Sequence, residues 1–256
     1  MQQRLVELRK QGRIADTLLL LEHPPVITLG RNAKISNVLL AREELAARGV
    51  DLFECDRGGD VTYHGPGQLV GYPIFDLRGF DTVDRKRKML GPVEFVRRME
   101  EALIRTCGDI GIPCERIPGL TGVWTACDSA HVQKKIAAIG IHISRGVTSH
   151  GFALNVNTDL NEFGLIVPCG IIDRPVTSMQ QELKAAGELA AGATLKIDDV
   201  AHTVSRNFGR VFAKQTLWLE SLDDLLATAQ PANQDLPAKA PEELRRAAQE
   251  DEIFLA

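Results

Sequence analysis

The alternation of apolar and polar residues along the chain predicts short strands and amphipathic helices. Apolar runs that are bounded by glycine, proline or charged residues are typical of strands. Such runs lie at residues 16–22, 53–55, 61–63, 69–74, 122–124, 135–143 and 152–156. Because the strands are interspersed with helices, we expect an α+β protein with a mixed β-sheet and flanking helices.

The clearest helical pattern spans residues 91–107. Pro92 stands where the first turn of a helix tolerates proline, and Phe95, Met99, Leu103 and Ile104 fall on one face. Further helices are predicted at residues 1–12, 41–48 and 196–212. Residues 219–256 carry nine acidic and three basic residues together with three prolines. We expect this segment to be a loosely attached or partly disordered tail that ends in a short acidic helix.

Composition changes this picture little and excludes some classes of protein. The 256 residues are 44% hydrophobic and 25% charged, with a formal net charge of −4, which is ordinary for a globular protein and argues against a nucleic-acid partner. The longest apolar run, Thr17–Leu21, is too short to cross a bilayer, and no signal peptide is evident. We therefore expect a cytoplasmic protein without a membrane partner.

The cysteines indicate free thiols. Five are present, at positions 55, 107, 114, 127 and 169, without the close pairs that a zinc site needs. Neither a disulfide framework nor a metal site is expected, and the usage fits a reducing compartment.

The run Arg57–Gln68 is the densest candidate for chemistry. It contains four glycines, one proline and several hydrogen-bonding side chains, which predicts a shaped loop that approaches a ligand closely. A glycine-rich surface turn is the alternative.

Further blocks decide between these interpretations. In order along the chain they are Glu22–Arg31, Gln68–Ile74, Lys135–Gly140, His150–Val156, Val167–Gly170 and Thr177–Ser178. With them the chain resembles the lipoyl(octanoyl) transferases from about Leu18 to Met179. These enzymes move an octanoyl group from acyl carrier protein to a lysine of a lipoyl domain.

The resemblance implies a fold similar to the catalytic domains of biotin and lipoate protein ligases. It implies a catalytic domain over residues 1–218, with a larger lobe to about residue 180, a small C-terminal lobe from about 181 to 218, and the tail of 219–256 after it. Members of the family usually begin with an extra strand and the first part of a helix before the segment that matches Gln2–Arg9. By this comparison the chain starts late, and we expect either a misassigned start codon or an uncovered sheet edge.

The resemblance also assigns the catalytic pair. The acyl-enzyme cysteine of the family falls on Cys169, between Pro168 and Gly170. A thiol with an ordinary pKa near about 8.5 needs a neighbouring cation or base to react at neutral pH. Lys135 supplies one by resemblance, whereas the adjacent Lys134 is expected to be a solvated surface residue.

Three segments match the substrate-binding segments of the family. They are Arg57, Gly58, Gly59, Asp60, Val61, Thr62, Tyr63 and His64, then Ala138, Ile139 and Gly140, then Gly151, Phe152 and Ala153. The small residues can line a narrow slot for an eight-carbon chain, and burying each methylene contributes about 0.8 kcal/mol. His64, His23 and Tyr72 are the polar side chains expected to face that slot.

The resemblance implies a two-step transfer in the first step of endogenous protein lipoylation. The donor is octanoyl-acyl carrier protein, and the acceptors are lipoyl domains of 2-oxoacid dehydrogenase E2 subunits and the glycine cleavage H protein. No cofactor is expected, in line with the absence of a P-loop sequence pattern. The alternatives are an ATP-dependent lipoate or biotin protein ligase, and a non-catalytic acyl-binding protein with the same fold.

Overall fold

The computed structural model describes residues 1–82, 88–126, 132–167, 174–190, 192–227, 229 and 253–255. The helices are α1 Gln2–Lys10, α2 Arg42–Ala47, α3 Pro92–Asp109, α4 Met179–Ala185, α5 Ile197–Phe212 and α6 Leu222–Ala227, with 3₁₀ turns at Ile35–Asn37, Leu77–Gly79 and Leu160–Leu165. The strands are β1 Thr17–Leu21, β2 Val26–Leu29, β3 Asp51–Glu54, β4 Val61–His64, β5 Gln68–Ile74, β6 Cys114–Ile117, β7 Leu120–Thr125, β8 Lys135–Ser144, β9 Val147–Asn155 and β10 Ile253–Leu255.

These strands form two sheets, and the predicted α+β class is confirmed. The main sheet has the order β1-β5-β9-β8-β7-β6, with β10 also paired to β8, and each of these pairs is antiparallel. A tight turn joins β8 to β9, with positive φ at both Arg145 and Gly146, and this geometry favours an antiparallel hairpin. Mixed strand directions occur in the small sheet, of order β3-β2-β4, where α2 provides the crossover that parallel β2 and β3 require.

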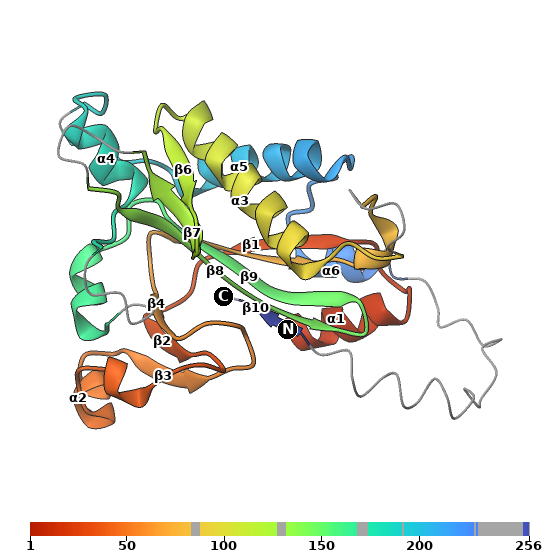
Figure 1. The fold of residues 1–256 in the computed structure, drawn as a ribbon, viewed down its shortest axis with the longest axis horizontal. Helices are drawn as coiled ribbons and strands as arrows, with labels where there is room; N and C mark the ends of the chain where they lie inside the picture. Colours follow the sequence, from red (N-terminus) through yellow and green to blue (C-terminus); the bar gives the residue numbers. More distant parts are fainter. Residues whose placement is uncertain are drawn as a thin grey trace.

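Helices α3 and α5 lie side by side over one face of the main sheet (Figure 1). The predicted face of α3 is correct, because Phe95, Met99 and Leu103 are fully buried in this core. Phe208 and Phe212 of α5 enter the same core. The residues of α5 therefore share a core with the main sheet, and a lobe boundary near residue 180 stays a prediction.

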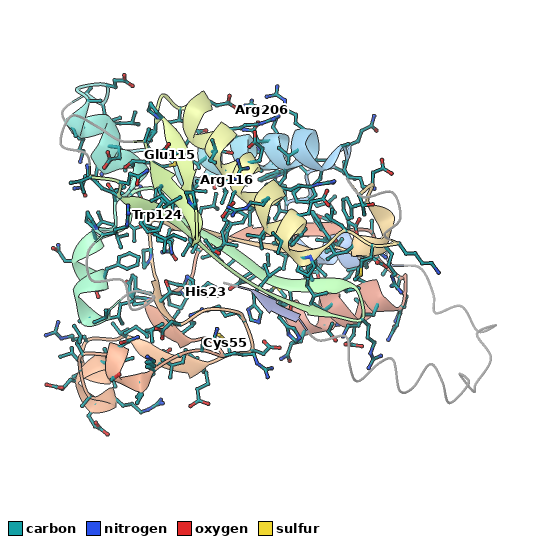
Figure 2. All side chains as sticks on the ribbon, in the orientation of Figure 1. His23, Cys55, Glu115, Arg116, Trp124 and Arg206 are labelled. Carbon is teal, nitrogen blue, oxygen red and sulfur yellow. The ribbon has the colours of Figure 1, made fainter. Side chains whose placement is uncertain are left out.

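The small sheet lies on the opposite side of the main sheet from α3 and α5. One face of the small sheet packs in its own apolar core, and the other face points away from that core. Ile27 and Leu29 of β2 pack with Val61 and Tyr63 of β4 in a separate core that includes Leu45 of α2. The intervening residues of these two strands point the opposite way, because successive side chains of a strand alternate between its faces. In Figure 2, His23 and Cys55 lie on the small-sheet side of the main sheet, whereas Arg206 lies on the side of α5.

The two ends of the chain differ from the prediction in one respect. The predicted N-terminal helix is α1, which packs through Leu5 and Leu8 against Ile74 of the main sheet. The tail contains an acidic helix, α6, but this helix lies near the start of the tail, and Ile253–Leu255 at the end form a strand. This strand, which pairs with β8, was not predicted, and the expected acidic helix before it lies outside the described residues. Within the described residues, no helix is long and apolar enough to cross a membrane.

Candidate active site

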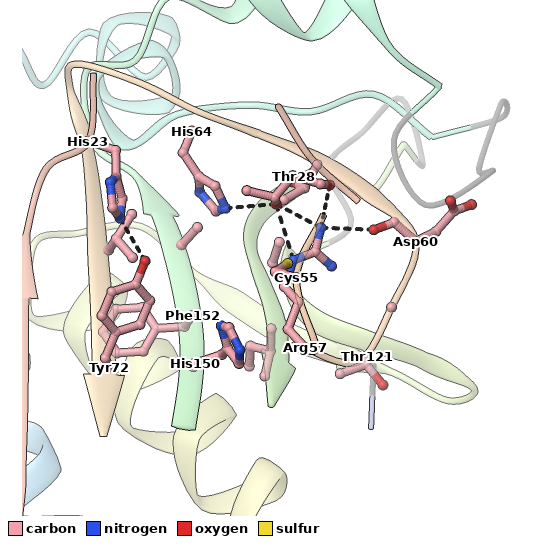
Figure 3. Close-up of a pocket in the computed structure, with 18 of the residues that line it drawn as sticks. His23, Thr28, Cys55, Arg57, Asp60, His64, Tyr72, Thr121, His150 and Phe152 are labelled. Carbon is pink, nitrogen blue, oxygen red and sulfur yellow. Dashed lines mark hydrogen bonds between the residues drawn. The ribbon is translucent and has the colours of Figure 1, made fainter. Parts of the chain in front are cut away.

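A cavity of about 880 Å³ lies between the main sheet and the small sheet (Figure 3). Most of the residues predicted to bind substrate line it. They are Arg57, Gly59, Asp60, Thr62, His64, Ala138, Ile139, Gly140, Gly151, Phe152 and Ala153, together with Lys135. The structure therefore brings the three predicted segments and the predicted base into one site.

Three of the predicted binding residues are placed differently. Val61 and Tyr63 point away from the cavity, into the core beneath the small sheet. The carbonyl of Gly58 lies over β8, and a Cβ atom added to Gly140 would come within 2.6 Å of its oxygen. Gly58 thus seats the loop on the sheet, and only a glycine at position 140 leaves room for it.

Arg57 organises the loop around its own side chain. The guanidinium donates hydrogen bonds to the carbonyl oxygens of Thr28, Gly58 and Asp60 at 2.7, 2.9 and 2.8 Å. The Asp60 carboxylate accepts from the backbone N–H groups of Lys34 and Val61. These bonds join the loop to β2. Arg57 therefore has two roles, because it lines the cavity and also maintains the conformation of the loop.

His64 begins a chain of buried polar groups. Its Nδ1 atom lies 2.8 Å from Oε1 of Gln68, whose amide donates to Oδ1 of Asn155, and the Asn155 amide donates to the carbonyl of Thr177. Burial lowers the pKa of His64 to about 3, with a further contribution from the charge of Arg57. The imidazole is therefore neutral at physiological pH and acts as a hydrogen-bonding group.

Two further polar clusters lie near the cavity, one at β5 and one that joins β8 and β9 to the residue after Cys55. His23 Nε2 and the Tyr72 hydroxyl oxygen are 2.6 Å apart and share a hydrogen bond. The Asp56 carboxylate accepts from His150 Nε2 and from His142 Nδ1, both at 2.6 Å. Burial alone would raise the pKa of Asp56, but these two hydrogen bonds hold it below its ordinary value.

Lys135 is the first residue of β8, and its backbone is fixed on both sides. Its N–H donates to the carbonyl of Pro175, and its own carbonyl accepts from the N–H of Thr177. Its Nζ atom lies 5.2 Å from the centre of the Trp124 ring. Lys134 points elsewhere and forms an ion pair with Glu182 at 3.1 Å. The structure thus separates the two neighbouring lysines.

Cys169 lies outside the described residues, which stop at Val167 and resume at Arg174. Both ends of this interval are anchored near the cavity. The N–H of Val167 donates to the carbonyl of Asn37, whose side chain donates to Asp60 at 2.5 Å. At the other end, the guanidinium of Arg174 lies 5.7 Å from the Trp124 ring centre.

Sequence reasoning missed Asp56, Glu22 and Cys55. Glu22 and Cys55 line the cavity, and the Glu22 carboxylate accepts from the N–H of Gly67 at 2.7 Å. The position of Asp56, directly before the glycine-rich run, was the available signal. Its histidine partners lie 86 and 94 residues away, which no local pattern reveals. Within the described residues, no group of three or more His, Cys, Asp or Glu side chains could hold a metal ion.

Comparison with known proteins gives consistent results. Residues 1–209 match the lipoyl protein ligase A/B catalytic domain. An octanoyltransferase of Koribacter versatilis is 61% identical over 98% of this chain and 92% of its own length. An octanoyltransferase of Acidobacterium capsulatum is 61% identical over 88% of this chain and 89% of its own length.

Solved structures share the fold at low sequence identity. A crystal structure of lipoate-protein ligase A bound with ATP has a TM-score of 0.60 at 17% identity, over 87% of this chain and 84% of that one. A bipartite lipoate protein ligase of Thermoplasma acidophilum, solved in a study that includes its E2 lipoyl domain, has a TM-score of 0.55 at 17% identity, over 88% and 84%.

Fold and site together define an α+β domain with a cavity enclosed by two sheets and bordered by a lysine. The chain belongs to the lipoyl protein ligase A/B catalytic domain family.

Proposed function

We propose that this protein is an octanoyltransferase that moves the octanoyl group from acyl carrier protein to a lipoyl-domain lysine through a thioester on Cys169. The observation that carries the proposal is the position of Lys135. It lines the apolar slot, and its backbone is hydrogen bonded to Pro175 and Thr177, which follow the segment that contains Cys169. Relatives that are 61% identical to this chain are octanoyltransferases, which supports the same reaction here.

The first step is attack of the Cys169 thiolate on the thioester carbonyl of the donor. The new C–S bond forms on Cys169, the C–S bond to the carrier breaks, and the departing carrier thiolate takes a proton from the Lys135 ammonium group. Val167 precedes the segment that contains Cys169, and its N–H donates to the carbonyl of Asn37, whose side chain donates to Asp60 of the cavity lining.

In the second step the lysine amine of the acceptor attacks the Cys169 thioester. A C–N bond forms, the C–S bond to Cys169 breaks and releases the Cys169 thiolate, and Lys135 takes the proton that the amine loses. Exchange of one thioester for another is nearly neutral in free energy, and amide formation is downhill. The transfer therefore needs no ATP.

The proposed partners follow from this chemistry. The donor is octanoyl-acyl carrier protein, and the acceptors are lipoyl domains of 2-oxoacid dehydrogenase E2 subunits and the glycine cleavage H protein. The Thermoplasma ligase, which shares this fold, was studied with its E2 lipoyl domain, and this supports an acceptor of that kind. We place the reaction in the cytoplasm, where both partners are made.

The test is transfer from octanoyl-acyl carrier protein to an apo lipoyl domain in the absence of ATP, followed by mass spectrometry. We expect the lipoyl domain to gain one octanoyl group, and the enzyme mixed with donor alone to carry one octanoyl group on Cys169. Modification that requires free octanoate and ATP would instead assign the chain to the ligases. Octanoate binding without transfer under either condition would assign it to the non-catalytic acyl-binding proteins.

Substitution of Gly122 by alanine is expected to lower the transfer rate by about tenfold to a hundredfold, the cost of misplacing a catalytic group. Gly122 has a φ of +127°, and an added Cβ atom would lie 2.6 Å from the carbonyl oxygen of Ala137 and 2.8 Å from Cε of Lys135. The substitution therefore displaces the start of β8 together with the Lys135 side chain. The rate of lipoyl-domain modification measures the effect.

Gly187→Ala is the matched control for Gly122→Ala. Gly187 has a φ of +74°, and a Cβ atom there would meet nothing within 4 Å. It tests the cost of alanine at a positive φ without contact to Lys135. Equal loss of transfer in both variants would attribute the effect to strain alone.

A further inference from the structure

The floor of the cavity changes in side-chain size from one end to the other. Over β8 and β9 it is made of small residues, with Ala138 opposite Ala153 and Gly140 opposite Gly151. Over β5 and β1 it is made of large ones. There Val70 pairs with Leu21, and Tyr72 pairs with Leu19. The carbonyl of Gly58 covers Gly140, so a ligand that lies across the sheet meets the small side chains of Ala138 and Ala153 and then a rise of larger side chains at β5.

Tyr72 forms the highest part of this rise and is held on two sides (Figure 3). Its hydroxyl shares the hydrogen bond with His23 at 2.6 Å. The ring of His150 lies against the Tyr72 ring edge-on, with centres 6.5 Å apart, and His150 is itself bound to Asp56. Two independent contacts thus fix the orientation of the tyrosine ring.

This wall suits the methyl end of an acyl chain. Burial raises the pKa of Tyr72 to about 12 and lowers that of His23, so both groups are uncharged at neutral pH. Nε2 of His23 and the Tyr72 hydroxyl are hydrogen bonded to each other. A methyl group can therefore contact the Tyr72 ring without burying a charge or breaking this bond.

The dimensions match a chain of eight carbons. Neighbouring strands are about 4.8 Å apart, so β8 and β5 are separated by about 9.6 Å. A carbon–carbon bond of about 1.5 Å advances an extended chain by roughly 1.3 Å, so eight carbons span about 9 Å. A chain whose carbonyl carbon lies over β8, the strand that begins with Lys135, therefore ends over β5.

We propose that Tyr72, held by His23, sets the length of the acyl chain that the cavity accepts. The proposal rests on the proposed octanoyl transfer. A longer chain cannot extend toward Leu19 and Leu21 of β1 unless the tyrosine ring leaves its place. Removal of the ring lengthens the slot by one strand spacing, about 4.8 Å, which equals roughly four more carbons.

The experiment measures kcat/KM for transfer from acyl carrier proteins loaded with chains of six to fourteen carbons. For Tyr72→Ala we expect the optimum to move from eight to about twelve carbons. Each newly buried methylene contributes about 0.8 kcal/mol, or roughly fourfold. The ratio of kcat/KM for twelve carbons over eight should therefore rise by at least about tenfold.

Two control variants distinguish a change in chain-length preference from a general loss of stability. Tyr72→Phe keeps the ring and loses only the bond to His23, so the optimum should stay at eight carbons. Leu18→Ala deletes a neighbour of Leu19 that packs into the core on the other face of the sheet. It should lower the melting temperature and leave the ratio unchanged. Tyr72→Leu, a smaller cut, replaces Tyr72→Ala if the alanine variant does not fold.

A folded Tyr72→Ala variant that still prefers eight carbons would overturn the proposal. Failure of the proposed function gives a different result, because the unaltered protein would then transfer no chain of any length. Calorimetric binding of octanoate and dodecanoate to the unaltered and Tyr72→Ala proteins tests the wall without catalysis. Dodecanoate should gain affinity relative to octanoate in the variant, and an unchanged ratio of affinities would also overturn the proposal.

Discussion

Replacement of Cys169 by alanine is expected to abolish octanoyl transfer to the lipoyl domain. The methyl group cannot hold the acyl chain between departure of the donor and arrival of the acceptor. Cys169→Ser should be very weak, because a hydroxyl is far harder to ionise than a thiol. The assay is transfer from octanoyl-acyl carrier protein, followed as modified lipoyl domain.

Cys114→Ala is the control for this substitution. Cys114 begins β6, at the edge of the main sheet, and does not line the cavity. Its loss should leave transfer close to that of the unaltered protein. Retention of more than about a tenth of the activity in Cys169→Ala would rule out the covalent mechanism, because loss of a covalent nucleophile costs far more.

Lys135→Met is expected to slow transfer by about 10²- to 10⁴-fold, the usual cost of losing a general base. Methionine keeps the approximate length and the apolar stem of the side chain, and loses the cation–π contact of Nζ with the Trp124 ring. Folding should therefore be intact, which a thermal melt checks. The decrease should appear in kcat, because the slot that binds the acyl chain is unaltered.

Lys134→Met is the matched control, since it changes the same residue type one position away. Its ion pair with Glu182 is partly exposed to solvent, and such pairs contribute little to stability. Transfer should be nearly unchanged. Equal impairment of the two variants would mean that Lys135 is not the base.

Much of the fold could be predicted because long elements carry strong patterns. The bounds of α3, α5 and β8 are close to those predicted, whereas β9 begins at Val147, before the predicted start at residue 152. The strands β2 and β6 were not predicted, because each has only four residues and pairing rather than local pattern stabilises it. The division into two sheets depends on the crossover through α2, which the strand pattern alone does not indicate.

For the site too, features that lie within one continuous segment could be predicted, whereas contacts between residues far apart in the sequence could not. Resemblance located the loop and the small residues of the floor, because these occupy continuous segments. The period of two in β4 could have shown that Val61 and Tyr63 face away from Thr62 and His64. Nothing local could join His23 to Tyr72, which lie 49 residues apart.

The histidines around the cavity also make the free energy of unfolding depend on pH. Burial lowers the pKa of His23, His64 and His150. As pH falls below the ordinary value of about 6.5, the unfolded chain binds protons that the native protein does not, so the free energy of unfolding falls with it. The loss therefore begins in mildly acidic solution, well above the range in which carboxylates titrate. The low proton affinity of the histidines in the native cavity thus sets a lower limit on the pH at which the whole molecule stays folded.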